Sequence, residues 1–105
     1  MAKRKPPPTP PGAREPLKTV LTARFRRDVE KARRSGRDVT KLAALMRAIA
    51  ERRGLEPARK DHSLRGEWTG CRDCHVEGDW VLIYETTDAA AIFHRTGSHS
   101  EVFGR

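Results

Sequence analysis

Pro57 marks a change in the spacing of the apolar residues, and this change restricts the possible folds more than any other feature of the chain. Before Pro57, two segments repeat apolar side chains with the period of a helix. After it, the apolar runs are short and alternate as strands do. The sequence therefore predicts an α+β domain, with an N-terminal strand and an antiparallel helix pair packed on a small, mostly antiparallel sheet in the order β-α-α-β-β-β.

The N-terminal half carries local signals for the strand and both helices. Residues 17–21 alternate weakly and suit a first strand, after which Thr22 can cap a helix over residues 23–34. Asp38 can cap the second helix, and Gly54 ends its apolar pattern. The apolar stripe of this second helix consists of Val39, Leu42, Leu45, Met46, Ile49 and Ala50.

The C-terminal half predicts three short strands over residues 71–76, 81–86 and 90–95. Gly78-Asp79 and Thr87-Asp88 lie in the connections, where turn-forming residues are expected. Short connections favour antiparallel neighbours, so these strands form the main part of the predicted sheet.

The first 16 residues differ from the rest of the chain. They are rich in proline and basic residues and contain nothing that could build a core, which predicts a disordered or polyproline-like tail. Residues 17–105 then form one compact domain, as expected for a chain of 105 residues.

The formal net charge of +8 favours polyanionic partners. Nucleic acid is the first expectation, followed by an anionic membrane surface or an acidic protein. No apolar run approaches the roughly 20 residues of a membrane span, and the charged N-terminus has no apolar signal segment. We therefore expect a cytoplasmic protein whose two cysteines are reduced.

Four histidines lie in the C-terminal half, at positions 62, 75, 94 and 99. Imidazole titrates near neutral pH and therefore suits proton transfer. On a strand, Asp73 and His75 share a face. Asp79 follows in the turn, where its carboxylate could approach His75 and fix its tautomer. At the end of the third strand, Arg95 and a glycine-containing turn that carries His99 could bind a phosphate.

Cys71-x-x-Cys74-His75 matches a haem-attachment pattern and is similar to zinc-ligand spacing. Covalent haem attachment of this kind requires export, a structural zinc site requires four ligands, and strand alternation would point the two sulfurs apart. We therefore expect no metal and no cofactor. Trp68 and Trp80 could stack on RNA bases or pack in the core, and Trp80 is the better candidate for stacking.

Residues 60–70 resemble the K-D-H-x-L-x-G-x-W-x-G signature of YafQ-type toxins, which belong to the RelE/ParE superfamily. The similarity continues through Arg72-Asp73-x-His75 and Asp79-Trp80-x-Leu82-Ile83-Tyr84. It ends with Arg95-Thr96-Gly97-x-His99 and Val102-Phe103-Gly104, so it spans residues 17–105 and omits the proline-rich tail. Cys71 and Gly78 depart from the family pattern.

This resemblance implies a RelE-like fold and the toxin of a type II toxin-antitoxin system. Such a toxin is a metal-independent endoribonuclease that cleaves mRNA in the A site of the 70S ribosome, and an antitoxin encoded by the adjacent gene neutralises it. Carried over to this chain, the catalytic residues are His62, His75, Asp79 and His99. The supporting or substrate-binding residues are Lys60, Arg72, Asp73, Trp80, Arg95 and Phe103.

RNA cleavage without a metal uses the 2′-hydroxyl of the substrate as the nucleophile and needs an acid, a base and a cation. We expect His99 to act as the acid, Asp79 and His75 on the side of the base, and Arg95 to stabilise the phosphate. His62 would orient the site or share the proton transfer. Two alternatives remain open: a ParE-like toxin that inhibits gyrase, and a basic RNA-binding module without catalysis.

Overall fold

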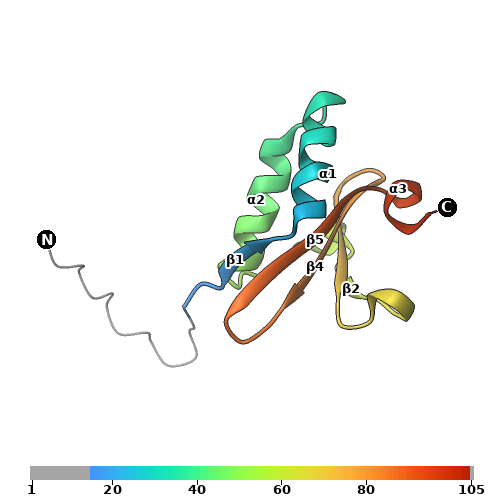
Figure 1. Cartoon of the computed structure of the whole chain (residues 1–105). Coiled ribbons are helices and arrows are strands. Elements are labelled where there is room, and N and C mark those ends of the chain that lie inside the picture. Colours follow the sequence, from blue (N-terminus) through green and yellow to red (C-terminus); the bar gives the residue numbers. More distant parts are fainter. Residues whose placement is uncertain (1–14, 105) are drawn as a thin grey trace, which may run out of the picture.

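A pair of helices lies on one face of a five-stranded sheet in the computed structural model, which describes residues 15–104 (Figure 1). Most of the predicted proline-rich tail, residues 1–14, falls outside this range. The regular elements are β1 (Lys18–Leu21), α1 (Ala23–Arg34), α2 (Val39–Ala50), η1 (Pro57–Arg59), β2 (His62–Ser63), η2 (Gly66–Trp68), β3 (Arg72–Glu77), β4 (Trp80–Thr86), β5 (Ala90–Ser98) and α3 (His99–Phe103).

Both long helices begin at the residues that the sequence predicted. The hydroxyl of Thr22 accepts a hydrogen bond from the backbone N–H of Phe25, and the Asp38 carboxylate accepts one from that of Thr40. These side chains satisfy amide groups that a helix N-terminus leaves without a partner. The predicted antiparallel helix pair is therefore confirmed, with local capping at each start.

The strands are arranged in the order β1-β5-β4-β3-β2. β1 runs parallel to β5, and the other neighbours are antiparallel. The predicted α+β class and the mostly antiparallel sheet are confirmed. The short edge strand β2 was not predicted, because two residues carry no alternation that could reveal it.

The C-terminal end differs from the expected turn. β5 continues to Ser98, and the helix α3 begins directly at His99. Ser98 and Glu101 form a capping box, in which each side chain bonds the backbone N–H of the other residue. A helix N-terminus, rather than a glycine-containing turn, therefore carries His99.

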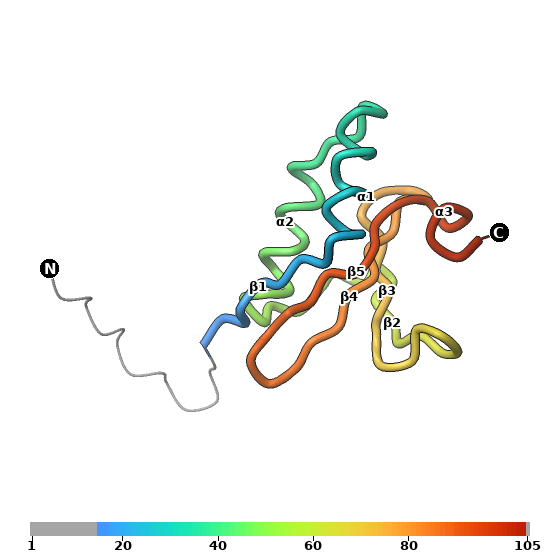
Figure 2. Tube along the Cα trace, viewed as in Figure 1, coloured from blue at the N-terminus to red at the C-terminus, as the bar shows by residue number. Residues whose placement is uncertain are grey.

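The sheet has apolar side chains on both faces. On the helix side, the core includes Phe25, Leu42 and Phe93. On the other face, a smaller cluster of Cys71, Val81, Ile83 and Val102 is covered by Leu64, Trp68 and Phe103. Figure 2 shows the segments that supply this cover, around β2 and in α3, away from α1 and α2. Among the described helices, none has both the length and the apolar character needed to cross a membrane.

Candidate active site

His75 of β3 and His99 of α3 lie side by side on the sheet face that the helix pair leaves uncovered. Their ring centroids are 5.3 Å apart, with one ring edge toward the other. The pairing of β4 with β5 explains this proximity, because Trp80 pairs with Ser98. The β3–β4 turn therefore meets the start of α3.

Asp79 forms a hydrogen bond with Nδ1 of His99. The sequence predicted that the Asp79 carboxylate would approach His75, and the structure corrects this pairing. The hydrogen bond from the His99 side chain, together with a weaker bond from its backbone N–H, lowers the pKa of Asp79. Asp79 is therefore ionised at neutral pH and fixes the orientation of the His99 ring.

The three predicted catalytic imidazoles share one arrangement, in which Nδ1 contacts an oxygen atom. Nδ1 of His62 lies 2.6 Å from the carbonyl oxygen of Lys60, and Nδ1 of His75 lies 3.2 Å from that of Gly78. A carbonyl oxygen only accepts, so Nδ1 of both rings carries the proton. In the neutral rings, Nε2 is consequently the nitrogen that can accept a proton.

Asp73 lies beneath these histidines and is only 2% exposed. One of its carboxylate oxygens is 3.8 Å from Nε2 of His62, and the other has no hydrogen-bond partner within residues 15–104. Burial raises the pKa of Asp73, while His62, His75 and His99 oppose this shift. Asp73 thus connects the three imidazoles electrostatically, and its predicted position on the His75 face is confirmed.

Three of the predicted supporting residues lie at the edge of this cluster. The carbonyl group of Lys60 holds His62, and the ring of Phe103 lies 5.9 Å from that of His99. Nε of Arg72 is 3.2 Å from the carboxylate of Asp61. Lys60 and Phe103 therefore contact catalytic candidates directly, whereas Arg72 pairs with an acidic neighbour.

Arg95 does not have the role that the sequence suggested. Its Nε lies 2.7 Å from the carboxylate of Asp28 in α1, and its side chain is only 10% exposed. A guanidinium group held in this way by a largely buried carboxylate is not available to a phosphate. Arg95 therefore joins α1 to β5, and the phosphate-binding role that the sequence suggested for it is not supported.

Trp80 also has a different role from the one suggested. It is 2% exposed, and its indole N–H donates to the hydroxyl of Thr96 over 2.8 Å. Stacking on an RNA base requires an open ring face, so Trp80 supports the site by packing in the core. Its position directly after Asp79 fixes the start of β4.

Arg37 is a candidate that the sequence analysis missed. Its guanidinium group lies over the Trp80 ring, 5.3 Å from the centroid, and contributes to the lowered pKa of Asp79. Arg37 belongs to the connection between α1 and α2, which is far from Asp79 in the sequence. No local pattern distinguishes it from the other arginines of this basic chain.

The C-x-x-C-H segment is divided between the two faces of the sheet, as strand alternation predicted. Cys71 belongs to the apolar cluster around Val81, and Cys74 belongs to the core on the helix side. His94, which the resemblance leaves outside the catalytic set, has its Nε2 2.7 Å from the carboxylate of Glu85.

The RelE-like fold and a cluster of histidines and acids on the open sheet face define the class of small bacterial toxins to which this chain is similar. Residues 17–104 match the family described as the bacterial toxin of a type II toxin-antitoxin system, YafQ. The chain belongs to this YafQ family.

Individual relatives agree with this assignment. The mRNA interferase toxin YafQ of Escherichia coli K12 is 43% identical over 84 residues, which cover 79% of this chain and 91% of the relative. The crystal structure of YafQ from E. coli BL21(DE3) superposes with a TM-score of 0.81 at 38% identity, covering 84% of this chain and 99% of that chain. The toxin in the E. coli DinJ-YafQ complex gives a TM-score of 0.78 at 39% identity, with coverage of 84% and 98%.

Proposed function

We propose that this chain is an mRNA endoribonuclease that acts on the ribosome without a metal ion and is neutralised by a cognate antitoxin. The observation that carries the proposal is the contact between His75 and His99, with Asp79 bonded to the second ring. Two adjacent imidazoles can supply the base and the acid that RNA cleavage needs. Membership in the YafQ family and the names of the relatives support the same activity.

In the proposed reaction, Nε2 of His75 takes the proton of the substrate 2′-hydroxyl. The 2′-oxygen then attacks the adjacent phosphorus, and the bond from phosphorus to the 5′-oxygen breaks. His99 gives the proton on its Nε2 to the departing 5′-oxygen. The products are a 2′,3′-cyclic phosphate and a free 5′-hydroxyl. One proton has moved from the RNA to His75, and one from His99 to the RNA.

Asp79 and Asp73 hold the acid and its surroundings in this scheme. The carboxylate of Asp79 accepts a hydrogen bond from Nδ1 of His99 and directs Nε2 outward. The buried carboxylate of Asp73 is placed to favour imidazolium forms around it. His62 lies on the other side of Asp73 and is placed to orient the substrate or to share the proton transfer.

Arg37 takes the role of the phosphate-binding cation in place of Arg95. Its side chain is 31% exposed, its charge helps to lower the pKa of Asp79, and it lies 3.8 Å from the carboxylate of Glu101, whereas Arg95 is held at 2.7 Å by Asp28. A guanidinium group offers paired donors to the oxygens of a phosphate. This arrangement would stabilise the charge that develops during the attack.

The open character of the site supports dependence on the ribosome. The side chains of His99 and Asp79 are 43% and 65% exposed, so water reaches both. A site of this kind benefits from a partner that orders the mRNA against it. The net charge of +8 suits binding to ribosomal RNA.

An antitoxin encoded by the adjacent gene is the second expected partner. The E. coli relative was crystallised as a DinJ-YafQ toxin-antitoxin complex. A partner that covers the face of His75 and His99, or that prevents docking on the ribosome, would silence the activity.

Cleavage of a defined mRNA by the purified chain tests the proposal, with and without translating ribosomes. We expect cuts only on ribosomes, a 2′,3′-cyclic phosphate at the new end, and no cut where the nucleotide before the cleavage site is 2′-deoxy. His75→Ala and His99→Ala should each lower the rate about 10²- to 10⁴-fold. Undiminished cleavage or toxicity in both variants, with folding verified by thermal unfolding, would refute the proposal.

A further inference from the structure

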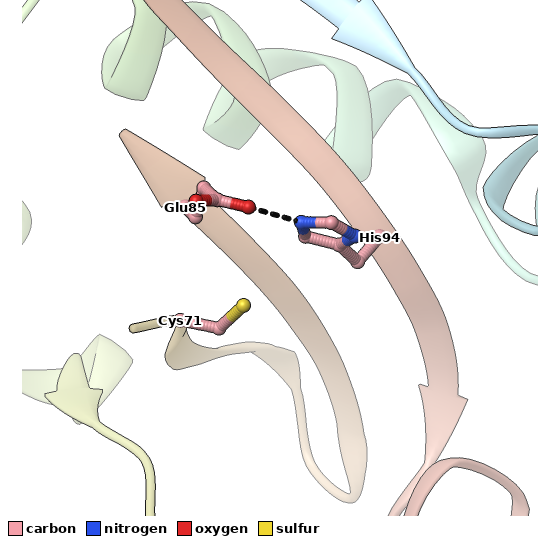
Figure 3. Close-up of side chains that lie close together, drawn as sticks. All are labelled: Cys71, Glu85 and His94. Atoms are coloured by element: carbon pink, nitrogen blue, oxygen red, sulfur yellow. Dashed lines mark hydrogen bonds and ion pairs between the residues drawn. The ribbon is translucent and has the colours of Figure 1, made fainter. Parts of the chain in front are cut away.

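Cys71, Glu85 and His94 form a second cluster of reactive side chains, separate from the candidate active site. One ligand atom from each residue lies within 4.8 Å of those of the other two. Figure 3 shows the three side chains directed toward a common space, with Glu85 on β4, His94 on β5 and Cys71 directly before β3. Within residues 15–104, no other set of three potential metal ligands is this compact.

We propose that Cys71, Glu85 and His94 bind a zinc-type divalent metal ion that stabilises the fold. Thiolate sulfur, imidazole nitrogen and carboxylate oxygen are the donors that Zn²⁺ takes in proteins, and the ion accepts three protein ligands with water as the fourth. The proposal does not depend on the ribonuclease activity, because none of these residues belongs to the catalytic set.

The backbone around the cluster is already fixed. The N–H of Cys71 donates to the carbonyl oxygen of Trp68 over 2.9 Å, and the N–H of Leu64 donates to the carbonyl oxygen of Cys71 over 2.9 Å. Glu85 and His94 project from the paired strands β4 and β5. The three donors therefore come from ordered elements, which reduces the entropic cost of binding an ion.

Burial and charge favour an ion over an empty cluster. Cys71 is buried, while the side chains of Glu85 and His94 are 34% and 25% exposed, so an ion can enter from their side. A divalent cation would balance the charges of the thiolate and the carboxylate, so the loaded site would be neutral.

Binding is a balanced exchange of protons for the ion. The Cys71 thiol releases its proton to solvent and forms a sulfur–metal bond. Neutral His94 changes its tautomer. Nε2 loses the proton that it donates to Glu85, Nδ1 gains one, and the lone pair of Nε2 then binds the metal. The Glu85 carboxylate exchanges this hydrogen bond for the metal.

Trp68 offers a donor next to the cluster. Its buried indole N–H has no hydrogen-bond partner within the described part of the chain, and its ring lies 6.0 Å from that of His94. Trp68 also packs against the apolar cluster that contains Cys71. A metal-bound thiolate would provide a charged acceptor in this region, as is common around metal sites.

The proposed ion is remote from the catalytic histidines along the sheet. Cys71 and His75 are separated by about 13 Å at the usual rise of a strand, and the β4 residues between the two sites are apolar. The ion would thus join the beginning of β3 to the end of β4 and to β5. Its expected effect is on stability rather than on the chemical step.

Titration of the full-length, reduced protein with Co²⁺ tests the site, because a thiolate ligand gives Co²⁺ a sulfur-to-metal charge-transfer band. We expect an equimolar end point with this band, and loss of the band when Zn²⁺ displaces Co²⁺. Cys71→Ser and His94→Gln should abolish the band or weaken binding at least about tenfold. Cys74→Ser is the matched control and should keep the band, since Cys74 lies on the opposite face of the sheet.

Thermal unfolding supplies a second readout. Zn²⁺ should raise the Tm of the wild type and of Cys74→Ser, but not that of Cys71→Ser, because an ion bound only to the folded state stabilises it. Absence of the band in the wild type would overturn the proposal. Persistence of the band in Cys71→Ser would also overturn it. Should Cys71→Ser fail to fold, the wild-type titration and the His94→Gln variant decide the matter.

Discussion

Asp79 and His99 are joined by a hydrogen bond from Nδ1 of the imidazole to the carboxylate, although they are 20 residues apart in the sequence. The pairing of Trp80 with Ser98 brings them together, because it aligns the turn before β4 with the start of α3. This bond selects one orientation of the ring. Nε2 is then the ring nitrogen that does not bond to Asp79.

Asp79→Asn should lower the cleavage rate without lowering stability. The amide cannot supply the charge that holds His99, so part of the catalysis is lost, but less than the roughly 10²- to 10⁴-fold expected from removing a proton-transfer group. Single-turnover cleavage on ribosomes measures the effect. Asp88→Asn, in the turn between β4 and β5 at the other end of β4, is the matched control and should cleave at the wild-type rate. Equal rates for Asp79→Asn and the wild type would exclude this role for the Asp79 carboxylate.

Arg95→Ala should destabilise the fold, because it leaves the largely buried Asp28 carboxylate without its partner. Breaking a buried ion pair on one side costs about 3–5 kcal/mol in the free energy of unfolding. Urea unfolding followed by circular dichroism measures the loss. The double variant Arg95→Met with Asp28→Leu should recover much of it, since both charges are then absent. A stable but inactive Arg95→Ala variant would restore the phosphate-binding role that the sequence suggested for Arg95.

Arg37→Ala should show the opposite behaviour. Its guanidinium group is partly exposed and lies as far as 3.8 Å from its partner Glu101, so its loss should change the Tm little and, if it binds the phosphate as proposed, reduce cleavage by about 10²-fold. Arg37→Lys keeps the charge without the paired donors and should restore part of the rate. Cleavage at saturating ribosome concentration separates this effect from weaker docking. An unchanged rate in Arg37→Ala would show that another cation serves the phosphate.

Asp73→Asn should raise stability at neutral pH and lower activity. The wild-type carboxylate is charged in a buried place with one oxygen unpartnered, and replacing it should add about 1 kcal/mol to the free energy of unfolding. Because burial raises its pKa, the folded state holds the proton more tightly than the unfolded state. The wild type should therefore recover relative to Asp73→Asn as the pH falls through the raised pKa toward 3.8. If the free energy of unfolding of Asp73→Asn exceeds that of the wild type by the same amount throughout this pH range, the result would contradict the explanation.

Glu101 should hold α3 in place in acid. The Lys31 ammonium and the backbone N–H of Ser98 lower the pKa of Glu101 to about 2 from 4.5. A lowered carboxyl pKa stabilises the fold above 4.5 and loses this effect as the pH falls through about 2. Hydrogen exchange of the α3 backbone amides measures this stabilisation. In Glu101→Gln, these amides should be weakly protected at neutral pH, and their protection should depend little on pH. Equal protection in both proteins at pH 7 would rule out this role.

The sequence predicted the helices well because their signals are local. The apolar period, together with the caps at Thr22 and Asp38, lies within a few residues of each boundary. The third helix was missed, although Ser98 and Glu101 carry the spacing of a capping box. A five-residue helix has little stability of its own and depends on the packing of Val102.

The candidate catalytic residues could be named from the match to the signature of YafQ-type toxins, but the residues that they contact could not. The pairing of Asp79 with His99, of Arg95 with Asp28 and of Arg37 with Trp80 each joins elements distant in the sequence. A register shift between Ile83 and Tyr84 adds to the difficulty, because a β-bulge breaks the alternation of side chains along β5.

The amino-acid sequence alone determined the α+β class, the two capped helices and the short strands, because periodicity and spacing are properties of neighbouring residues. The resemblance to the YafQ family supplied the candidate site residues. Only the tertiary structure decided which charges meet. Contacts between distant segments depend on strand register and helix docking, which the whole chain sets together. For this reason Arg95 pairs with Asp28, Arg37 lies over the ring of Trp80, and Cys71 lies close to Glu85 and His94.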